Sequence, residues 1–524
     1  MPDAPSPTRF AAFLQKITCL RCAPRELWII YAAYILENIA YKCGAANVVR
    51  LWLHSDLGFS QMDASWWIAT WSAIMTLITV LVGSLTDAMG IRRTFLLGFL
   101  VCLVARCVMV LTICQWIVLP FGLYLQAVGM ALMVPVMIAG VKKFSNAAQR
   151  TIAFSLYYAL MNLGFAIGDG IFDGVRGSKA LGTWVFSCFG RTFGSIDFSR
   201  LPFGLGENGH WIMPLIGMEL SSYRALFFIG SMFTVPGLLL VWLFLRDGVE
   251  MTEDGVVITP RPENADSGLS WIATLWTTCK ATASQSVSIF LGLWQQPAFH
   301  RFLVFMTLVV GVRMIFFQLT FTYPAYSILE LGPGAPFAHI TGMLNSVMIL
   351  VLVPICGVLT QKVSAYRMVM VGSLISALSV FFIAMPPQWF QPLADGWLGK
   401  VIVTDWLGVT GRVNPIYIST FIFIVFLSIG EALWSPRLYE YSAAIAPRGQ
   451  EASYMALSML PYFGGKLAAG ALSGWLLETF CPETGQRHSE IMWMVVGCMA
   501  LITPVGAYIF RRHIQVQEDG RTVN

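Results

Sequence analysis

Apolar runs of about 20 residues recur from one end of the chain to the other, and shorter polar segments separate them. A helix of about 20 apolar residues is long enough to cross the hydrocarbon core of a bilayer. The pattern predicts about twelve membrane-spanning helices, near Leu27–Leu53, Trp66–Thr86, Thr94–Ile113, Ile117–Val141, Thr151–Ile171, Ala225–Leu245, Phe302–Ile328, Ile340–Leu359, Met368–Met385, Ile416–Ile445, Tyr454–Leu476 and Met492–Ile509. A set of soluble domains of this length is excluded, because these runs recur from end to end of the chain.

One break in composition divides the predicted spans into two sets of six. We expect a cytoplasmic N-terminal tail at 1–26, a first bundle at 27–246, a cytoplasmic linker at 247–299, a second bundle at 300–511 and a cytoplasmic C-terminal tail at 512–524. The later part of the linker, Ser270–Leu293, could form an amphipathic helix on the membrane surface. Lys and Arg gather in the tails and in the loops after spans 2, 4 and 8, which places both termini in the cytoplasm.

Composition agrees with an all-α polytopic membrane protein and excludes several function classes. Hydrophobic residues make up 57% of the chain and charged residues 12%, about half the usual share in soluble proteins. The net charge of +5 is spread between spans rather than gathered in a patch, so no nucleic-acid partner is indicated. The six His are not paired at metal-ligand spacing, and Cys19 and Cys22 form a lone Cys-x-x-Cys. We therefore expect no metal, no cofactor and no enzyme activity, and the absence of a phosphate-binding loop argues against an ATP-driven pump.

The turn after the second span combines two glycines, an acid and two bases: Gly83, Asp87, Gly90, Arg92 and Arg93. A glycine lets two helices approach closely, and a second glycine suits a tight turn. This spacing resembles the loop between helices 2 and 3 of the major facilitator superfamily. The resemblance implies a fold of two six-helix bundles and a conformational gating role for these five residues, whereas the alternative is an ordinary loop between spans. A degraded copy, Gly357 to Lys362 followed by Arg367, supports an internal duplication.

Charged side chains inside the predicted spans are the most informative residues, because a charge at mid-bilayer costs about 2.5–3.5 kcal/mol or more. They are Glu37 and Lys42 in span 1, Arg106 in span 3, Arg313 in span 7, Glu431 in span 10 and Lys466 in span 11. They could line a polar cavity between the two bundles, where they would bind a solute or protons. The alternative is static ion pairs between helices. The sequence leaves the pairing open, with Arg313–Glu431 and Lys42–Glu431 as two possibilities, and Asp169 is expected at the membrane interface.

Four stretches carry a closer resemblance: Glu37 to Tyr41 and on to Ser60; Val128 to Pro135 with Arg150 and Phe154 to Gly164, which includes Tyr157 and Asn162; the loop motif; and Gly430 to Pro447, which includes Glu431 and Trp434, with Gly465 to Ala468. They resemble the proton-dependent oligopeptide transporters. Two positions depart from the family. Its helix-1 pattern Glu-x-x-Glu-Arg reads Tyr34, Glu37 and Asn38 here, and the lysine before its helix-4 proline is Val134.

The resemblance implies a secondary active transporter that moves a small polar solute, possibly di- or tripeptides, by alternating access with proton coupling. In the family, the acid matching Glu431 faces the amino end of a peptide. The bases Lys42, Arg106 or Lys466 could replace the missing cation, and Tyr41, Tyr157 and Trp434 could line side-chain pockets. We expect a monomer in the bilayer, with protons and a small molecule as partners. A receptor or scaffold that binds a solute without coupled transport is the alternative, since the lost Glu-Arg pair permits it.

Overall fold

The computed structural model describes residues 20, 23–176, 184–188, 191–196, 204–205, 211–213, 218–252, 255–258, 280, 292, 294–360, 363–445 and 460–514. For some residues inside helices, among them 80–88 and 439–445, it describes the backbone alone. The proposed amphipathic segment and most of both tails lie outside the described residues.

The first bundle contains the helices expected for spans 1 to 6. Its elements are α2 (Arg25–Gly44), α3 (Ala46–Ser55), α4 (Gln61–Met89), α5 (Ile91–Leu111), α6 (Gln115–Val118), the π-helical turn η2 (Leu119–Tyr124), α7 (Leu125–Lys143), α8 (Ala147–Arg176) and α9 (Ser222–Phe244). Span 1 is broken at Ala45, whose backbone (φ −138°, ψ −114°) is not helical. Gly90 has a φ of +83° at the start of α5, a conformation that favours glycine, as the sequence predicted for a tight turn.

The second bundle contains the helices expected for spans 7 to 12. Its elements are α11 (Pro297–Phe321), α12 (Tyr323–Leu331), η6 (His339–Leu344), α13 (Asn345–Leu359), α14 (Ala365–Ala384), η7 (Pro387–Phe390), α15 (Gln391–Ala394), α16 (Trp397–Gly399), η8 (Lys400–Trp406), α17 (Pro415–Ile445), α19 (Leu460–Phe480), α20 (Ser489–Ala500), α21 (Ile502–Ile509) and α22 (Arg511–Ile514). Within the described part of the chain, nine helices are long and apolar enough to cross a membrane. The polytopic all-α prediction is confirmed.

Short strands occur in two connections that the sequence assigned to loops and linker. Between α8 and α9 lie the hairpin β1 (Trp184–Cys188) and β2 (Arg191–Ile196), and a three-stranded sheet of β3 (Gly204–Leu205), β4 (Trp211–Met213) and β5 (Met218–Leu220). After α9, strands β6 (Val249–Thr252) and β7 (Gly255–Ile258) form a hairpin in which Val249 pairs with Ile258. All of these pairings are antiparallel.

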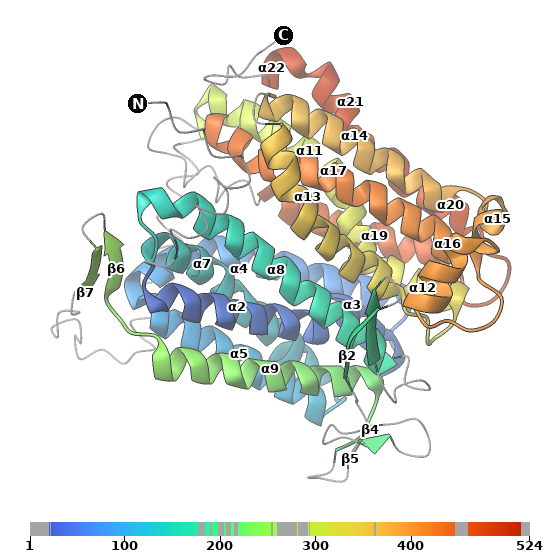
Figure 1. Cartoon of the computed structure of the whole chain (residues 1–524), viewed down its shortest axis with the longest axis horizontal. Helices are drawn as coiled ribbons and strands as arrows, with labels where there is room; N and C mark the ends of the chain where they lie inside the picture. Colours follow the sequence, from blue (N-terminus) through green and yellow to red (C-terminus); the bar gives the residue numbers. More distant parts are fainter. Residues whose placement is uncertain are drawn as a thin grey trace, which may run out of the picture.

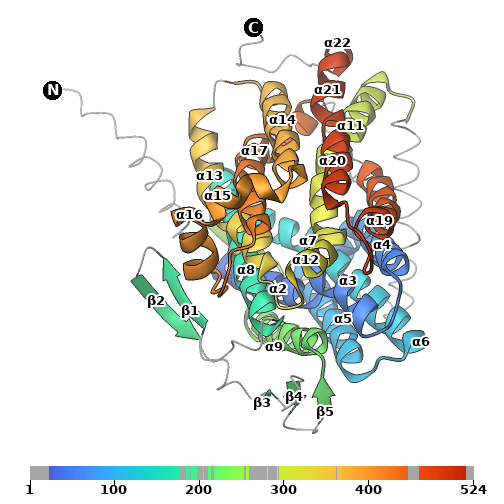
Figure 2. The ribbon, with the colours of Figure 1, turned by 90° about the vertical axis from the view of Figure 1, so that its right-hand side faces the viewer.

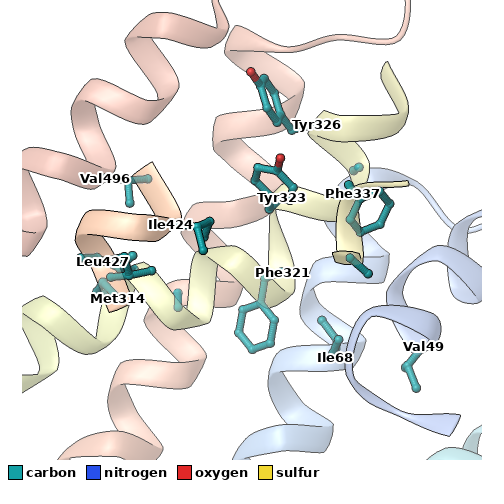
Figure 3. Packing of buried hydrophobic residues seen from close by; sticks show 14 of the residues in the cluster. Val49, Ile68, Met314, Phe321, Tyr323, Tyr326, Phe337, Ile424, Leu427 and Val496 are labelled. Atoms are coloured by element: carbon teal, nitrogen blue, oxygen red, sulfur yellow. The ribbon is translucent and has the colours of Figure 1, made fainter. Parts of the chain in front are cut away.

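The two bundles lie side by side (Figures 1 and 2), and they meet where α4 packs on α19, α8 on η6 and α13, and α3 on α11 and α12. One apolar cluster of buried residues runs through this junction. Figure 3 shows Val49 and Ile68 of the first bundle near Phe321, Tyr323 and Phe337 of the second. We call this junction the outer end, after the side that the Lys and Arg distribution predicts. A continuous core therefore closes the molecule at one end of the helices.

Candidate functional site

The bundles join along two lines of contact, the first of which pairs α4 with α19. A Cβ atom added at Gly470 would lie 2.1 Å from the Cβ of Ala69 and 3.0 Å from the Ser65 carbonyl oxygen. A Cβ at Gly474 would lie 2.5 Å from the Met62 sulfur. The two helices can touch here only because both positions are glycine. We call this line of contact the α4–α19 seam.

Polar groups also cross the α4–α19 seam. The Gln61 amide donates to the Glu483 carboxylate at 3.0 Å, and the Met62 backbone N–H donates to Glu478 at 3.2 Å. Deeper in the seam, the hydroxyls of Ser65 and Ser473 lie 3.5 Å apart. The chain of hydroxyls continues from Ser473 to Thr322 at the end of α11, 2.9 Å away.

The second line of contact joins the end of α8 to η6. Asp173 accepts hydrogen bonds from the His339 backbone N–H at 2.6 Å and lies 2.8 Å from its Nδ1. Arg176 donates to the Pro333 carbonyl at 2.8 Å, and its guanidinium stacks on Phe337. Gly342 packs against the Asp169 carboxylate. All of these contacts lie at the outer end, which is sealed in this conformation.

Two ion pairs of the first bundle involve charges that the sequence placed inside the spans. Glu37 of α2 and Arg106 of α5 are 2.8 Å apart, and the Arg106 side chain is fully buried and also bonds Thr234 of α9. An ion pair between helices is the arrangement that the sequence left as an alternative. Lys42 pairs with Asp169 of α8 at 2.8 Å, not with Glu431. Asp169 is 1% exposed, and its expected place at the membrane interface stays a prediction.

The remaining spanning charges gather in the second bundle. Glu431 of α17 accepts a hydrogen bond from Asn345 of α13 at 3.0 Å, and the Arg313 guanidinium lies 4.8 Å from the centre of the Trp434 ring and 5.6 Å from that of Tyr462. The charge of Arg313 acts electrostatically on both Glu431 and Lys466. We call Arg313, Glu431, Trp434, Tyr462 and Lys466 the C-terminal cluster.

The cluster also reaches the first bundle. Lys466 of α19 donates to the Thr76 hydroxyl at 2.7 Å and to the Ser72 carbonyl at 3.3 Å, both on α4. Four of the sequence candidates, Arg313, Glu431, Trp434 and Lys466, therefore lie in one neighbourhood of the second bundle, and Lys466 contacts the first bundle. Glu37 and Arg106 do not join them in this conformation.

The comparisons with known proteins agree with this architecture. The profile of the Major Facilitator Superfamily matches residues 28–190. A solved structure of a POT-family transporter in complex with 5-aminolevulinic acid is 16% identical, with a TM-score of 0.59, and the alignment covers 94% of this chain and 97% of that one. The chain has the major facilitator fold.

Two further solved structures extend the likeness in fold. One, on substrate recognition in proton-dependent oligopeptide transporters, is 14% identical with a TM-score of 0.64 and covers 93% of this chain and 98% of that one. The other, a peptide transporter POT in complex with sulfate, is 16% identical with a TM-score of 0.61 and covers 94% and 95%. No curated protein matches the chain significantly. The expected resemblance to the proton-dependent oligopeptide transporters is confirmed at the level of the fold.

In this major facilitator fold, the residues of the loop motif occupy the end of the first bundle away from the seam. Arg92 donates to the Trp242 carbonyl at 2.8 Å and pairs with Asp247 at 3.6 Å. Arg93 is exposed and borders an apolar groove of about 510 Å³ on α5 and α9. At Gly83 and Asp87 the structure describes the backbone alone. The gating role of the loop motif stays a prediction.

The aromatic and amide candidates make contacts within the first bundle. Tyr157 of α8 stacks on Tyr34 of α2 with ring centres 4.3 Å apart, and Tyr41 lies 6.0 Å from Phe165. Asn162 donates to the Tyr158 carbonyl of its own helix. Tyr34 stands where the family has its first helix-1 acid, so an aromatic stack replaces that charge here.

Sequence reasoning missed Arg50. This residue of α3 is completely buried, and its guanidinium donates to Gln61 at 2.9 Å and to Ser65 at 3.2 Å. It lies inside the predicted span Leu27–Leu53, so the cost of burying a charge could have identified it.

Proposed function

We propose that this protein is a secondary active transporter that moves a small polar solute across a membrane by alternating access. Two features support this. The bundles are joined at the outer end by apolar contacts, close glycine contacts and polar contacts such as Asp173–His339, and these can separate without unfolding either bundle. Ionisable side chains of the C-terminal cluster lie beside that junction, where a solute would meet them. In transporters built from two repeats, the solute site lies at such a junction, and the bundles rock around it.

Glu431 is the residue that we assign to proton coupling. Its carboxylate is 8% exposed, accepts from the neutral Asn345 amide and feels the nearby Arg313 charge. A carboxylate held between a burial cost and a cationic neighbour can change its protonation when the neighbourhood changes. The solute would then bind against the same group, so that solute and proton move together.

The solved structures with the same fold are described as peptide transporters, and one holds 5-aminolevulinic acid. Both ligand types are small and carry an amine and a carboxylate. We propose di- and tripeptides and similar amino acids as the first solutes to test. We also propose that the protein acts as a monomer, with both termini in the cytoplasm.

The test uses purified protein in liposomes with an imposed pH gradient. Wild-type protein should accumulate a labelled dipeptide or amino acid, and Glu431→Gln should abolish accumulation while leaving exchange of solute between the two sides without a gradient. Glu250→Gln, which changes an exposed acid on the β6–β7 hairpin, is the matched control and should behave as wild type. Binding without accumulation by the wild-type protein would overturn transport and favour a receptor.

A further inference from the structure

We propose that the α4–α19 seam binds the carboxylate of a net-negative solute, with Arg50 at its outer end and Lys466 further in. This proposal rests on the proposed transport function and specifies its substrate class. It follows from two buried or half-buried cations on one line of contact, neither of which has a carboxylate partner among the described residues.

Arg50 carries the first uncompensated charge. It is 0% exposed, and among the described residues its hydrogen-bond acceptors are the neutral oxygens of Gln61 and Ser65. Its Nε and Nη1 atoms are buried and have no hydrogen-bond partner in the described part of the chain. A guanidinium stays protonated in proteins. Because a buried charge and buried donors without partners are both costly, an anion that binds at this place would relieve both penalties.

Lys466 carries the second. Its ammonium donates to the Thr76 hydroxyl and the Ser72 carbonyl, which are neutral, and the nearby charge is that of Arg313, another cation. The positive charge of Arg313 adds to that of Lys466, so the binding of an anion at this point becomes more favourable.

Three other bases of the described spans have opposite partners: Arg106 pairs with Glu37, Lys42 with Asp169, and Arg176 with Asp173. Arg313 lies near enough to Glu431 to interact with it electrostatically. At the outer end of the seam, the carboxylates of Glu483 and Glu478 accept hydrogen bonds from Gln61 and Met62, not from Arg50 or Lys466. Arg50 and Lys466 are therefore bases of the seam that contact no carboxylate among the described residues.

The two cations lie at successive depths of the same helix pair. On α4, the contacts of Arg50 end at Ser65 and those of Lys466 begin at Ser72, which are about 10 Å apart along the helix axis. On the antiparallel α19, Ser473 meets Ser65 and Lys466 meets Ser72. A solute that enters when the seam opens from outside would thus meet Arg50 first and Lys466 second.

This charge pattern differs from what a zwitterion needs. A zwitterion requires one anionic and one cationic anchor, whereas Glu431 and Arg313 already provide such a pair and the seam adds two more cations. An acidic peptide or a small dicarboxylate uses the added charges. A neutral or basic solute leaves them unpaired.

The binding test needs no gradient, so its failure is separate from a failure of transport. The melting temperature of purified protein is measured with glutamyl-glutamate, succinate, alanyl-alanine, lysyl-lysine and chloride alone. We expect stabilisation by the first two and little by the rest. Arg50→Gln and Lys466→Gln should each weaken the binding of glutamyl-glutamate about tenfold or more, the size expected for a hydrogen-bonded charge. Arg50→Lys should retain part of it, and the exposed control Arg412→Gln should retain all of it.

The stability of the free protein provides the second readout. Because Arg50→Gln removes an uncompensated charge, the substituted protein without solute should melt at or above the temperature of the wild type. A large drop in melting temperature with unchanged solute preference would make Arg50 a structural residue and overturn the proposal. Stabilisation by chloride alone, or preference for alanyl-alanine or lysyl-lysine, would also overturn it. Uptake of alanyl-alanine under a pH gradient would then leave the transport function standing.

Discussion

Gly470 offers the sharpest test of the outer seal, because one methyl group added there has nowhere to go. In Gly470→Ala, the new Cβ would lie 2.1 Å from the Ala69 Cβ, whereas carbon atoms in contact prefer about 3.5–4.0 Å. Helices α4 and α19 would have to separate by more than 1 Å at this point, on the order of the overpacking that costs about 1–3 kcal/mol. Applied to the sealed conformation alone, that cost shifts the population toward the open one by about 5- to 150-fold.

The assay places a cysteine at the buried Ser473 position, in a background where the exposed Cys107, Cys114 and Cys498 are serine. A membrane-impermeant maleimide added from outside labels that cysteine only when the seam opens. We expect faster labelling in Gly470→Ala than in the parent protein. Gly464→Ala is the matched control on the same helix, since a Cβ there meets no atom within 4 Å. Equal labelling of the two alanine variants would refute the idea that this glycine contact holds the outer end shut.

Two further predictions concern stability. Glu37→Gln or Arg106→Leu alone should each lower the free energy of unfolding by about 3–5 kcal/mol, because each leaves a buried charge or set of donors without its partner. The double variant should recover much of this loss. Chemical unfolding of the three variants measures it, and losses that simply add in the double variant would contradict the prediction. At the other end of α2, burial alone would raise the pKa of Glu26, but hydrogen bonds from Arg246 at 2.6 Å and Arg25 hold its pKa below the usual value. The stabilising effect of Glu26 is therefore complete above about pH 4.3 and is lost as the pH falls through the lowered pKa. The difference in melting temperature between the wild type and Glu26→Gln should vanish in acid. A difference that persists in acid would mean that the bonds to Arg246 and Arg25 are not its cause.

The helices could be predicted well because their signal is long and periodic. The predicted span Ile416–Ile445 corresponds to α17, and the expected duplication corresponds to the two bundles. The break at Ala45 could not be predicted, because alanine has high helix propensity. A Cβ atom added at its neighbour Gly44 would lie 3.1 Å from the Nε atom of Arg106. A residue far away in the sequence therefore packs closely against this part of the chain. The short strands between α8 and α9 lie in a Gly-rich stretch that gave no alternating pattern long enough to read.

Partners of the spanning charges were beyond the sequence for a geometric reason. A charge in a helix has a known depth but an unknown rotation about the helix axis. Lys42 therefore could face Glu431 of the other bundle or Asp169 of its own, and packing chose Asp169. The depth of Arg50 in its span could be predicted from the sequence, but this residue was not included among the charges inside the spans. Of the six charges that the sequence placed inside the spans, Arg313, Glu431 and Lys466 lie near one another, whereas Glu37, Lys42 and Arg106 form pairs in the first bundle; their role in solute binding stays a prediction, and the aromatic neighbour Tyr462 was not foreseen.

The confinement of Glu37–Arg106 and Lys42–Asp169 to one bundle affects how easily the molecule can cycle. A rocking motion carries both partners of each pair together, so no strong Coulomb attraction has to be broken or remade in the first bundle. Across the α4–α19 seam, the polar contacts that must be undone are hydrogen bonds, several of them made by the charged groups of Glu478, Glu483 and Lys466, and water can take the place of the lost partner. The difference in free energy between the conformation sealed at the outer end and the one open there can then be small enough for a single bound solute to reverse its sign.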